Sequence, residues 1–290
     1  MPILRVIDLD RRKPESCYLQ DARRDVTSQF GEDGIIEKIF EIVPPANRWC
    51  VEYGAWDGVY LSNTYHLVHD LGWNGVLIEG DPAKFAELET NCAGLANAHP
   101  VQAVVGFDNG VDALDDVLAG TDCPHAPDLA SIDVDGADYF LWQSMKAYRP
   151  RVVVIEFNPT VPNDVVFVQD RDLAVHQGAS LAAMVELGKR KRYELVAVTN
   201  CNAFFVDEPL FPAFGIEDNS IDAMRANVTG RIFHGYDGTI YTKMRPLQWV
   251  GRGDTRPPID VFQLLPPEER NWHDKLESQQ TDSADGEDDD

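Results

Sequence analysis

Short apolar segments alternate with amphipathic ones along most of the chain, and this alternation constrains the fold more than any other feature. Nearly continuous apolar runs predict strands that are buried on both faces of a sheet. Strands that alternate with helices predict a parallel sheet with helical crossovers. Strands are expected at residues 49–53, 75–78, 101–105, 129–133, 152–157, 193–198 and 203–206, and helices at 28–43, 63–71, 82–92, 111–118, 137–148 and 180–191.

Only four residues, 199–202, join the last two expected strands. A connection this short favours a hairpin, so the last strand should run antiparallel to its neighbour. The predicted fold class is therefore α/β and Rossmann-like. It has a mostly parallel seven-stranded sheet whose last strand is antiparallel, with helices on both faces.

The first two strands end in acidic loops, which read WCVEYGAWDG (residues 49–58) and LIEGDP (residues 77–82). Glycine at Gly54 permits a sharp turn close to a ligand, because it has no Cβ. Glu79 follows Gly54 by 25 residues, where doubly wound folds place the acid that binds ribose hydroxyls. Gly54 and Gly58 form G-x-x-x-G instead of the G-x-G-x-x-G of dinucleotide binders. The spacing disfavours NAD and favours S-adenosylmethionine, which has a ribose but no pyrophosphate.

Polar residues or glycines follow all five parallel strands, at the edge where open α/β sheets bind ligands. Single acids at such ends often cap helices or form turns, but five consecutive strand ends are harder to explain in this way. Asp108 could meet an adenine amino group while Phe107 packs on the ring. Glu52, in an apolar strand, needs a buried partner, and the cofactor's ammonium group would be one. The predicted cofactor site comprises Gln29, Glu52, Gly54, Asp57, Gly58, Asn63, Glu79, Gly80, Asp81, Gly106, Phe107, Asp108 and Asp133.

Asp133, Glu156 and Asn158 form a second constellation at the ends of two neighbouring strands. Such hard oxygen ligands predict a Mg²⁺ site that would lower the pKa of an acceptor hydroxyl. The alternative is that Asp133 caps a helix and Glu156 pairs with a cation. His176 is a candidate general base, with an ordinary pKa of ~6.5, or a structural histidine. The predicted catalytic residues are Asp133, Glu156 and His176, and the predicted metal ligands are Asp133, Glu156 and Asn158.

The chain has 290 residues, a formal charge of −24 and five cysteines. Such an acidic chain repels a phosphate backbone, so nucleic acid is excluded as a partner. The basic run at 189–192 reads as the solvated end of a helix. The odd cysteine count and the absence of C-x-x-C spacing favour a reducing cytoplasm. Residues 1–14 lack the apolar core of a signal peptide, and no apolar run reaches the ~20 residues of a membrane span.

Composition divides the chain into four parts. Residues 1–27 are polar and predict an N-terminal arm. Residues 28–206 form the α/β domain, with an aperiodic insertion at 158–178 that is expected over the ligand edge. Residues 207–277 predict an irregular cap, and residues 278–290 a disordered acidic tail.

Several strings, in this order, resemble the FkbM-type branch of the S-adenosylmethionine-dependent methyltransferases: SQFGED (28–33), EYGAWDG (52–58), LIE (77–79), SIDVDG (131–136) and VIE (154–156). The resemblance implies a class I methyltransferase fold and methyl transfer to an oxygen of a small-molecule acceptor. It also implies that Gly54, Asp57, Glu79 and Asp133 line the cofactor pocket. Asp81 stands where the branch more usually has Asn. A cofactor-binding regulatory module and a metal-dependent hydrolase are the alternatives, and a homodimer is left open.

Overall fold

The computed structural model describes residues 10–108, 110–227, 230–234, 239–244, 261–263 and 265–270. The chain divides into two compact units, and the first holds all of the described residues up to Asn227.

The first unit contains a seven-stranded sheet in the order β3-β2-β1-β4-β5-β7-β6. Strands β1 to β5 pair in parallel, whereas β7 runs antiparallel to both β5 and β6. This order and register confirm the predicted Rossmann-like fold class. The strands are β1 (Trp49–Tyr53), β2 (Asn74–Glu79), β3 (Ala98–Gln102), β4 (Leu129–Ile132), β5 (Val152–Glu156), β6 (Tyr193–Val198) and β7 (Asn202–Asp207).

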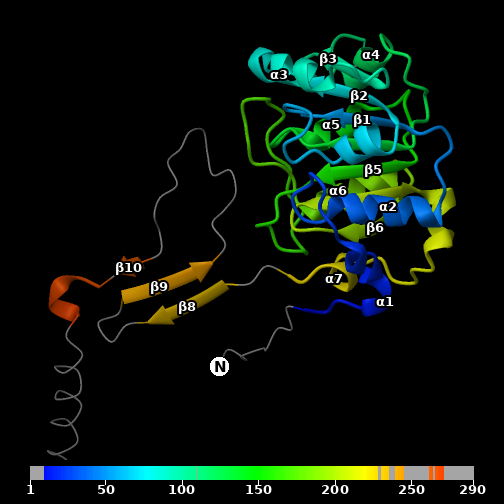
Figure 1. Cartoon of the computed structure of the whole chain (residues 1–290). Coiled ribbons are helices and arrows are strands. Elements are labelled where there is room, and N and C mark those ends of the chain that lie inside the picture. The colour runs from blue at the N-terminus through cyan, green and yellow to red at the C-terminus, as the bar shows by residue number, and fades with distance from the viewer. Residues whose placement is uncertain are drawn as a thin grey trace, which may run out of the picture. The chain divides into compact units, whose positions relative to one another are not determined.

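Helices flank the sheet on both faces (Figure 1). Asp81 caps α3 by accepting from the amides of Ala83 and Lys84, and Pro82 occupies the first turn, where its missing N–H costs nothing. Ser180 caps α6 in the same way, through the amide of Ala183. The helices of this unit are α1 (Pro14–Cys17), α2 (Glu32–Ile42), α3 (Pro82–Cys92), α4 (Leu114–Leu118), α5 (Asp138–Ser144), α6 (Leu181–Arg190) and α7 (Ile221–Met224), with 3₁₀ turns at Tyr18–Ala22 and Glu208–Phe214.

Five elements differ clearly from the sequence prediction, among them α4, which begins at Leu114 and not at residue 111, and α5, which ends at Ser144 and not at residue 148. Strand β3 begins three residues earlier than predicted and includes Pro100, which an edge strand tolerates because one of its sides needs no ladder hydrogen bond. The predicted helix at 63–71 is a short π-helix, His66–Asp70. Helix α2 begins at Glu32 and not at residue 28, because Gly31 adopts a left-handed φ of 91°.

The predicted N-terminal arm packs on the segment that follows the sheet. Leu19 is fully buried. Tyr18 donates its hydroxyl hydrogen bond to the carbonyl of Phe214 (3.0 Å), and Gln20 donates to the carbonyl of Met224 (3.0 Å). Two segments about 200 residues apart in sequence therefore complete one body.

The described part of the second unit contains a three-stranded antiparallel sheet, β8 (Gly230–His234), β9 (Thr239–Met244) and β10 (Val261–Gln263). The predicted acidic tail, residues 278–290, lies outside the described residues. The five cysteines all lie among the described residues, and none of them forms a disulfide. Among the described helices, none has both the length and the apolar character that a membrane crossing requires.

Candidate active site

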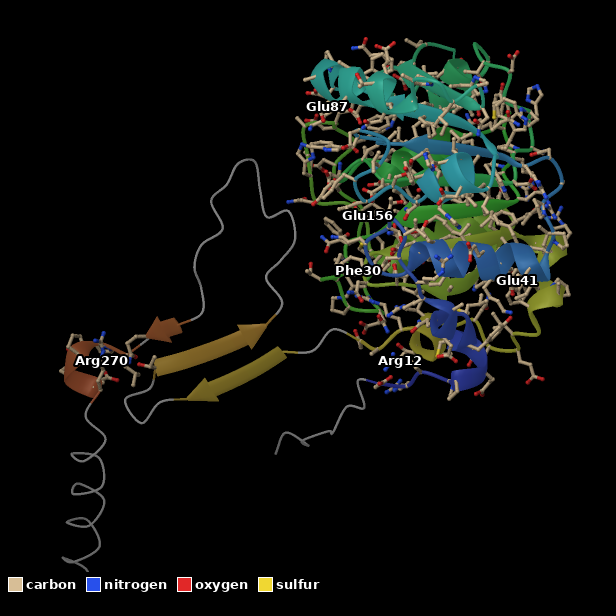
Figure 2. The ribbon with its side chains drawn as sticks, in the orientation of Figure 1. Arg12, Phe30, Glu41, Glu87, Glu156 and Arg270 are labelled. Carbon is tan, nitrogen blue, oxygen red and sulfur yellow. The ribbon has the colours of Figure 1, made fainter. Side chains whose placement is uncertain are left out.

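A cavity of about 580 Å³ lies where β1, β2, β4 and β5 end. Glu156, the last residue of β5, and Phe30, just before α2, lie on the side of the sheet toward which β5 points (Figure 2). This is the edge at which open α/β sheets bind ligands. Eight predicted site residues line the cavity: Gln29, Glu52, Gly54, Asn63, Glu79, Gly80, Asp133 and Glu156.

Glu79 ends β2 and is 7% exposed. Its Oε2 accepts from the amide of Trp56 (2.9 Å) and its Oε1 from the amide of Asp81 (2.7 Å). The two amides fix the carboxylate at the cavity wall, and each oxygen keeps a further lone pair. Glu79 can therefore accept hydrogen bonds from two neighbouring hydroxyls.

Glu52 is buried in β1 and has three protein donors. Its Oε2 accepts from the hydroxyls of Ser62 (2.6 Å) and Thr64 (2.8 Å), and its Oε1 from the amide of Asn63 (2.8 Å). Burial raises the pKa of Glu52, and these hydrogen bonds oppose that rise. The partner that the sequence analysis sought in a ligand ammonium is thus supplied by residues 62–64. Glu52 holds this segment as a wall of the cavity.

Gly54 lies where the ends of three strands meet. Its φ is 70°, and a Cβ here would overlap the carbonyl oxygen of Asp133. The amides of Gly54 and Ala55 both donate to the carbonyl of Ile78 (3.1 and 3.0 Å). Glycine is required here for both its conformation and its size.

Carboxyl oxygens of Asp133 and Glu156 lie within 4.8 Å of each other at the ends of β4 and β5. Burial raises the pKa of both groups, and the neighbouring carboxylates raise it further. Two buried carboxyl groups this close disfavour a double negative charge, so a state in which the pair shares one proton is favoured. Oε2 of Glu156 is buried and has no hydrogen-bond partner.

Asp138 joins this pair, and one oxygen from each of the three residues lies within 4.8 Å of the others. Its two oxygens accept from the amides of Val134 (2.9 Å) and Gly136 (3.0 Å), so Asp138 also braces the turn between β4 and α5. Burial raises the pKa of Asp138 to about 6.

Asn158, the third predicted metal ligand, does not line the cavity. Its Oδ1 accepts from the amide and hydroxyl of Thr160, and its Nδ2 donates to the carbonyl of Gln177 (2.8 Å). These contacts shape the insertion. The third carboxyl beside Asp133 and Glu156 is that of Asp138, which the sequence analysis did not name.

His176, the predicted base, is exposed and does not line the cavity. Its Nδ1 hydrogen-bonds the carbonyl oxygen of Asp135 (3.0 Å). Gln169 holds the same segment, since its Oε1 accepts from the amides of Gln177 (2.9 Å) and Gly178 (2.7 Å). His176 therefore fastens the insertion to the turn after β4.

Six predicted cofactor residues lie outside the cavity lining, and most have a local structural role. Asp57 accepts from the amides of Val59 (2.9 Å) and Tyr60 (2.7 Å), which closes its own turn. Asp108 pairs with Arg171 at 3.0 Å on the surface. The six are Asp57, Gly58, Asp81, Gly106, Phe107 and Asp108.

The sequence analysis missed the apolar rim of the cavity. Five exposed apolar side chains line it from three loops: Trp56, Tyr60, Leu61, Val104 and Leu173. The available signal was the placement of Trp56 and Tyr60 in loops that already held predicted ligand residues.

No protein-family model and no curated protein matches the chain. Similar solved structures include an S-adenosylmethionine-dependent methyltransferase from Clostridium acetobutylicum ATCC 824 (10% identity, 60% of this chain and 89% of that chain, TM-score 0.39). Others are the N-terminal domain of EvdMO1 with SAH and D-fucose (12%, 61% and 82%, 0.39) and a SAM-dependent methyltransferase from Aquifex aeolicus (10%, 61% and 88%, 0.37). Likenesses this low carry no argument about substrate, and the fold class rests on the strand order and register.

Proposed function

We propose that the protein is an S-adenosylmethionine-dependent methyltransferase that acts on a hydroxyl group of a small molecule. The observation that carries the proposal is Glu79, which ends β2, lines the cavity and has both oxygens held in place by backbone amides. In doubly wound folds this position clasps a ribose. The sequence resemblance to FkbM-type methyltransferases supports the same cofactor.

The acidic and the uncharged side chains of the cavity would bind different parts of the cofactor. Glu79 would accept hydrogen bonds from the ribose hydroxyls, and the amide side chains of Gln29 and Asn63 would donate to the cofactor's carboxylate. When bound, S-adenosylmethionine supplies an electrophilic methyl group on a positively charged sulfur. The carboxylates of the cavity favour that positive charge.

The Asp133–Glu156 pair is the proposed acceptor of the hydroxyl proton. With one shared proton, the pair carries one negative charge, and its charged oxygen can accept a hydrogen bond from the substrate hydroxyl. The proton would pass to the pair as the hydroxyl oxygen bonds the methyl carbon and the bond between that carbon and sulfur breaks, which leaves the neutral thioether S-adenosylhomocysteine. Much of the acceleration would come from holding the reacting atoms in line.

A bound Mg²⁺ is the alternative to the carboxyl pair for activating the acceptor hydroxyl. Mg²⁺ would meet Asp133, Asp138 and Glu156, which offer the hard oxygen ligands that it prefers. It would lower the pKa of the substrate hydroxyl. Loss of turnover in excess chelator, restored by Mg²⁺, would favour this route, whereas full turnover assigns the proton to the carboxyl pair alone.

Titration with S-adenosylhomocysteine (SAH), the demethylated product, tests the proposal. Glu79→Ala removes two charge-assisted hydrogen bonds to the ribose and should weaken SAH binding about tenfold or more. The control is Asp81→Asn, because Asp81 caps α3 outside the cavity lining and asparagine caps equally well. Unchanged affinity in Glu79→Ala would contradict the proposal.

A further inference from the structure

The cavity has exposed apolar side chains in its lining. Five large apolar side chains that line it remain 38–67% exposed: Trp56, Tyr60, Leu61, Val104 and Leu173. Exposed apolar groups that converge on one cavity mark a binding surface. Trp56 and Tyr60 also offer flat ring faces against which a ligand ring can pack.

The wall and floor of the same cavity are acidic. Its lining contains five carboxyl groups, those of Glu52, Glu79, Asp133, Asp135 and Glu156, and among the described residues that line it there is no lysine, arginine or histidine. Lys84 contacts the ring of Trp56 and Arg171 lies two residues before Leu173 in the chain, but both have acidic partners. Lys84 covers the Trp56 ring and pairs with Glu87 (3.0 Å), and Arg171 pairs with Asp108 (3.0 Å).

One acceptor atom in this lining lacks a donor. Glu52 and Glu79 have their protein donors, whereas no described N–H or hydroxyl group donates to the carboxyl of Glu156, which lines the cavity and is 6% exposed. A buried unpaired oxygen is costly, so a ligand hydroxyl that donates to it would bind favourably. An anionic ligand group would instead meet like charge, which is strongly unfavourable.

We propose that the methyl acceptor is an uncharged, hydroxyl-bearing molecule with a ring-sized apolar face and that the site rejects anionic acceptors. The hydroxyl donates to Glu156, and the apolar face packs on the rim formed by Trp56, Tyr60 and Leu173. This inference rests on the proposed function, because it places the acceptor beside the cofactor in the same cavity.

The proposed preference for uncharged acceptors is tested with matched pairs of neutral and anionic ligands. The full chain is used, saturated with SAH. The pairs are 4-nitrophenyl glucoside and glucuronide, 4-hydroxybenzamide and 4-hydroxybenzoate, and adenosine and its 5′-monophosphate. Binding is followed by ligand-observed NMR. In each pair that binds, the neutral member should bind at least about tenfold more tightly. Tighter binding of any anionic member, or binding of no neutral member, overturns the inference. Failure of SAH itself to bind overturns the proposed function instead.

Two substitutions test which residues cause the preference for neutral ligands. Glu156→Gln replaces a carboxyl with an amide that can donate, and it should reduce the preference for the neutral member about tenfold. Leu173→Ala should weaken neutral ligands several-fold, whereas Val166→Ala, which is also exposed but does not line the cavity, should have no effect. An unchanged preference in Glu156→Gln, or equal effects of the two alanine variants, would contradict the assigned contacts.

Discussion

The carboxyl pair at the ends of β4 and β5 carries an electrostatic cost that depends on pH. Both groups have a pKa raised by burial. The stability that they contribute is therefore fully present below their unfolded pKa of about 4 and is lost as the pH rises through the folded values. The native state must then hold a second charge in a site that disfavours it.

Replacing Glu156 with glutamine removes one of the two carboxyl groups that cause this loss of stability at high pH. We expect Glu156→Gln to gain stability relative to the parent chain as the pH rises from about 5 to about 9, measured by urea unfolding. The control is Glu87→Gln, which makes the same change at an exposed position in α3. A stability difference that is constant with pH would contradict the raised pKa.

Gly54 and Gly72 separate two reasons for a glycine. Both adopt a left-handed φ, 70° and 68°, but a Cβ at Gly54 meets the backbone of Asp133, whereas one at Gly72 meets nothing within 4 Å. Gly72→Ala should cost only the conformational penalty of about 1 kcal/mol. Gly54→Ala should cost several times more and should abolish SAH binding. Equal losses in the melting temperature would show that close approach plays no part.

Sequence reasoning located site residues best where a spacing rule applied. Glu79 was found because doubly wound folds place an acid at a set distance after the first glycine turn, and it lines the cavity. Asp57 and Asp81 satisfy the same strand-end pattern, yet they close a turn and cap a helix. A local sequence cannot distinguish these uses, since either role needs a short acid after a strand.

The role of Glu52 was harder to predict from the sequence. Its donors come ten to twelve residues later in the chain, from a segment whose path to Glu52 depends on the folded turn after β1. The pattern showed that a buried acid needs partners, but it did not show whether these came from protein or ligand.

At the level of elements, the buried strands were the most predictable. Strand β1 spans the predicted residues 49–53, and α3 spans the predicted 82–92, because continuous burial and clear caps leave strong signals. Strand β3 was displaced in the prediction because it is a half-exposed edge strand without an apolar run.

Asp128 connects elements at the end of the sheet where the parallel strands begin, opposite the cavity. It is fully buried before β4 and accepts from the amides of Ala46, Asn47 and Arg48, at 2.7, 2.8 and 2.6 Å, and from Arg151 at 2.6 Å. We expect Asp128→Asn to cost about 3 kcal/mol in the free energy of unfolding, because an amide cannot satisfy all of these donors. SAH affinity of the folded variant should be unchanged.

The control for Asp128 is Glu208→Gln, which removes an exposed ion pair with Arg192 and should cost at most about 1 kcal/mol. Similar unfolding midpoints for the two variants would show that the buried carboxylate does not brace the loop before β1.

At the scale of the molecule, the sequence did not predict that the N-terminal segment packs against the end of the first unit. Tyr18 and Gln20 donate to carbonyls near the end of that unit, and such contacts follow no local pattern because they depend on where two distant segments meet. Among the residues that the structure describes, the hydrophobic core draws its members only from positions 19 to 224.

Two truncations test whether the segment after the sheet belongs to this body. A chain that ends at Asn227 retains the whole described core and should melt near the parent temperature and bind SAH with parent affinity. A chain that ends at Asp207 loses Phe214, Ile216 and Met224, all buried, each of which contributes about 2 kcal/mol. That loss approaches the whole stability of a typical domain, so the shorter chain should unfold or lose most of its stability in circular dichroism and calorimetry. A stable, SAH-binding chain ending at Asp207 would instead show that residues 208–227 are dispensable for the fold.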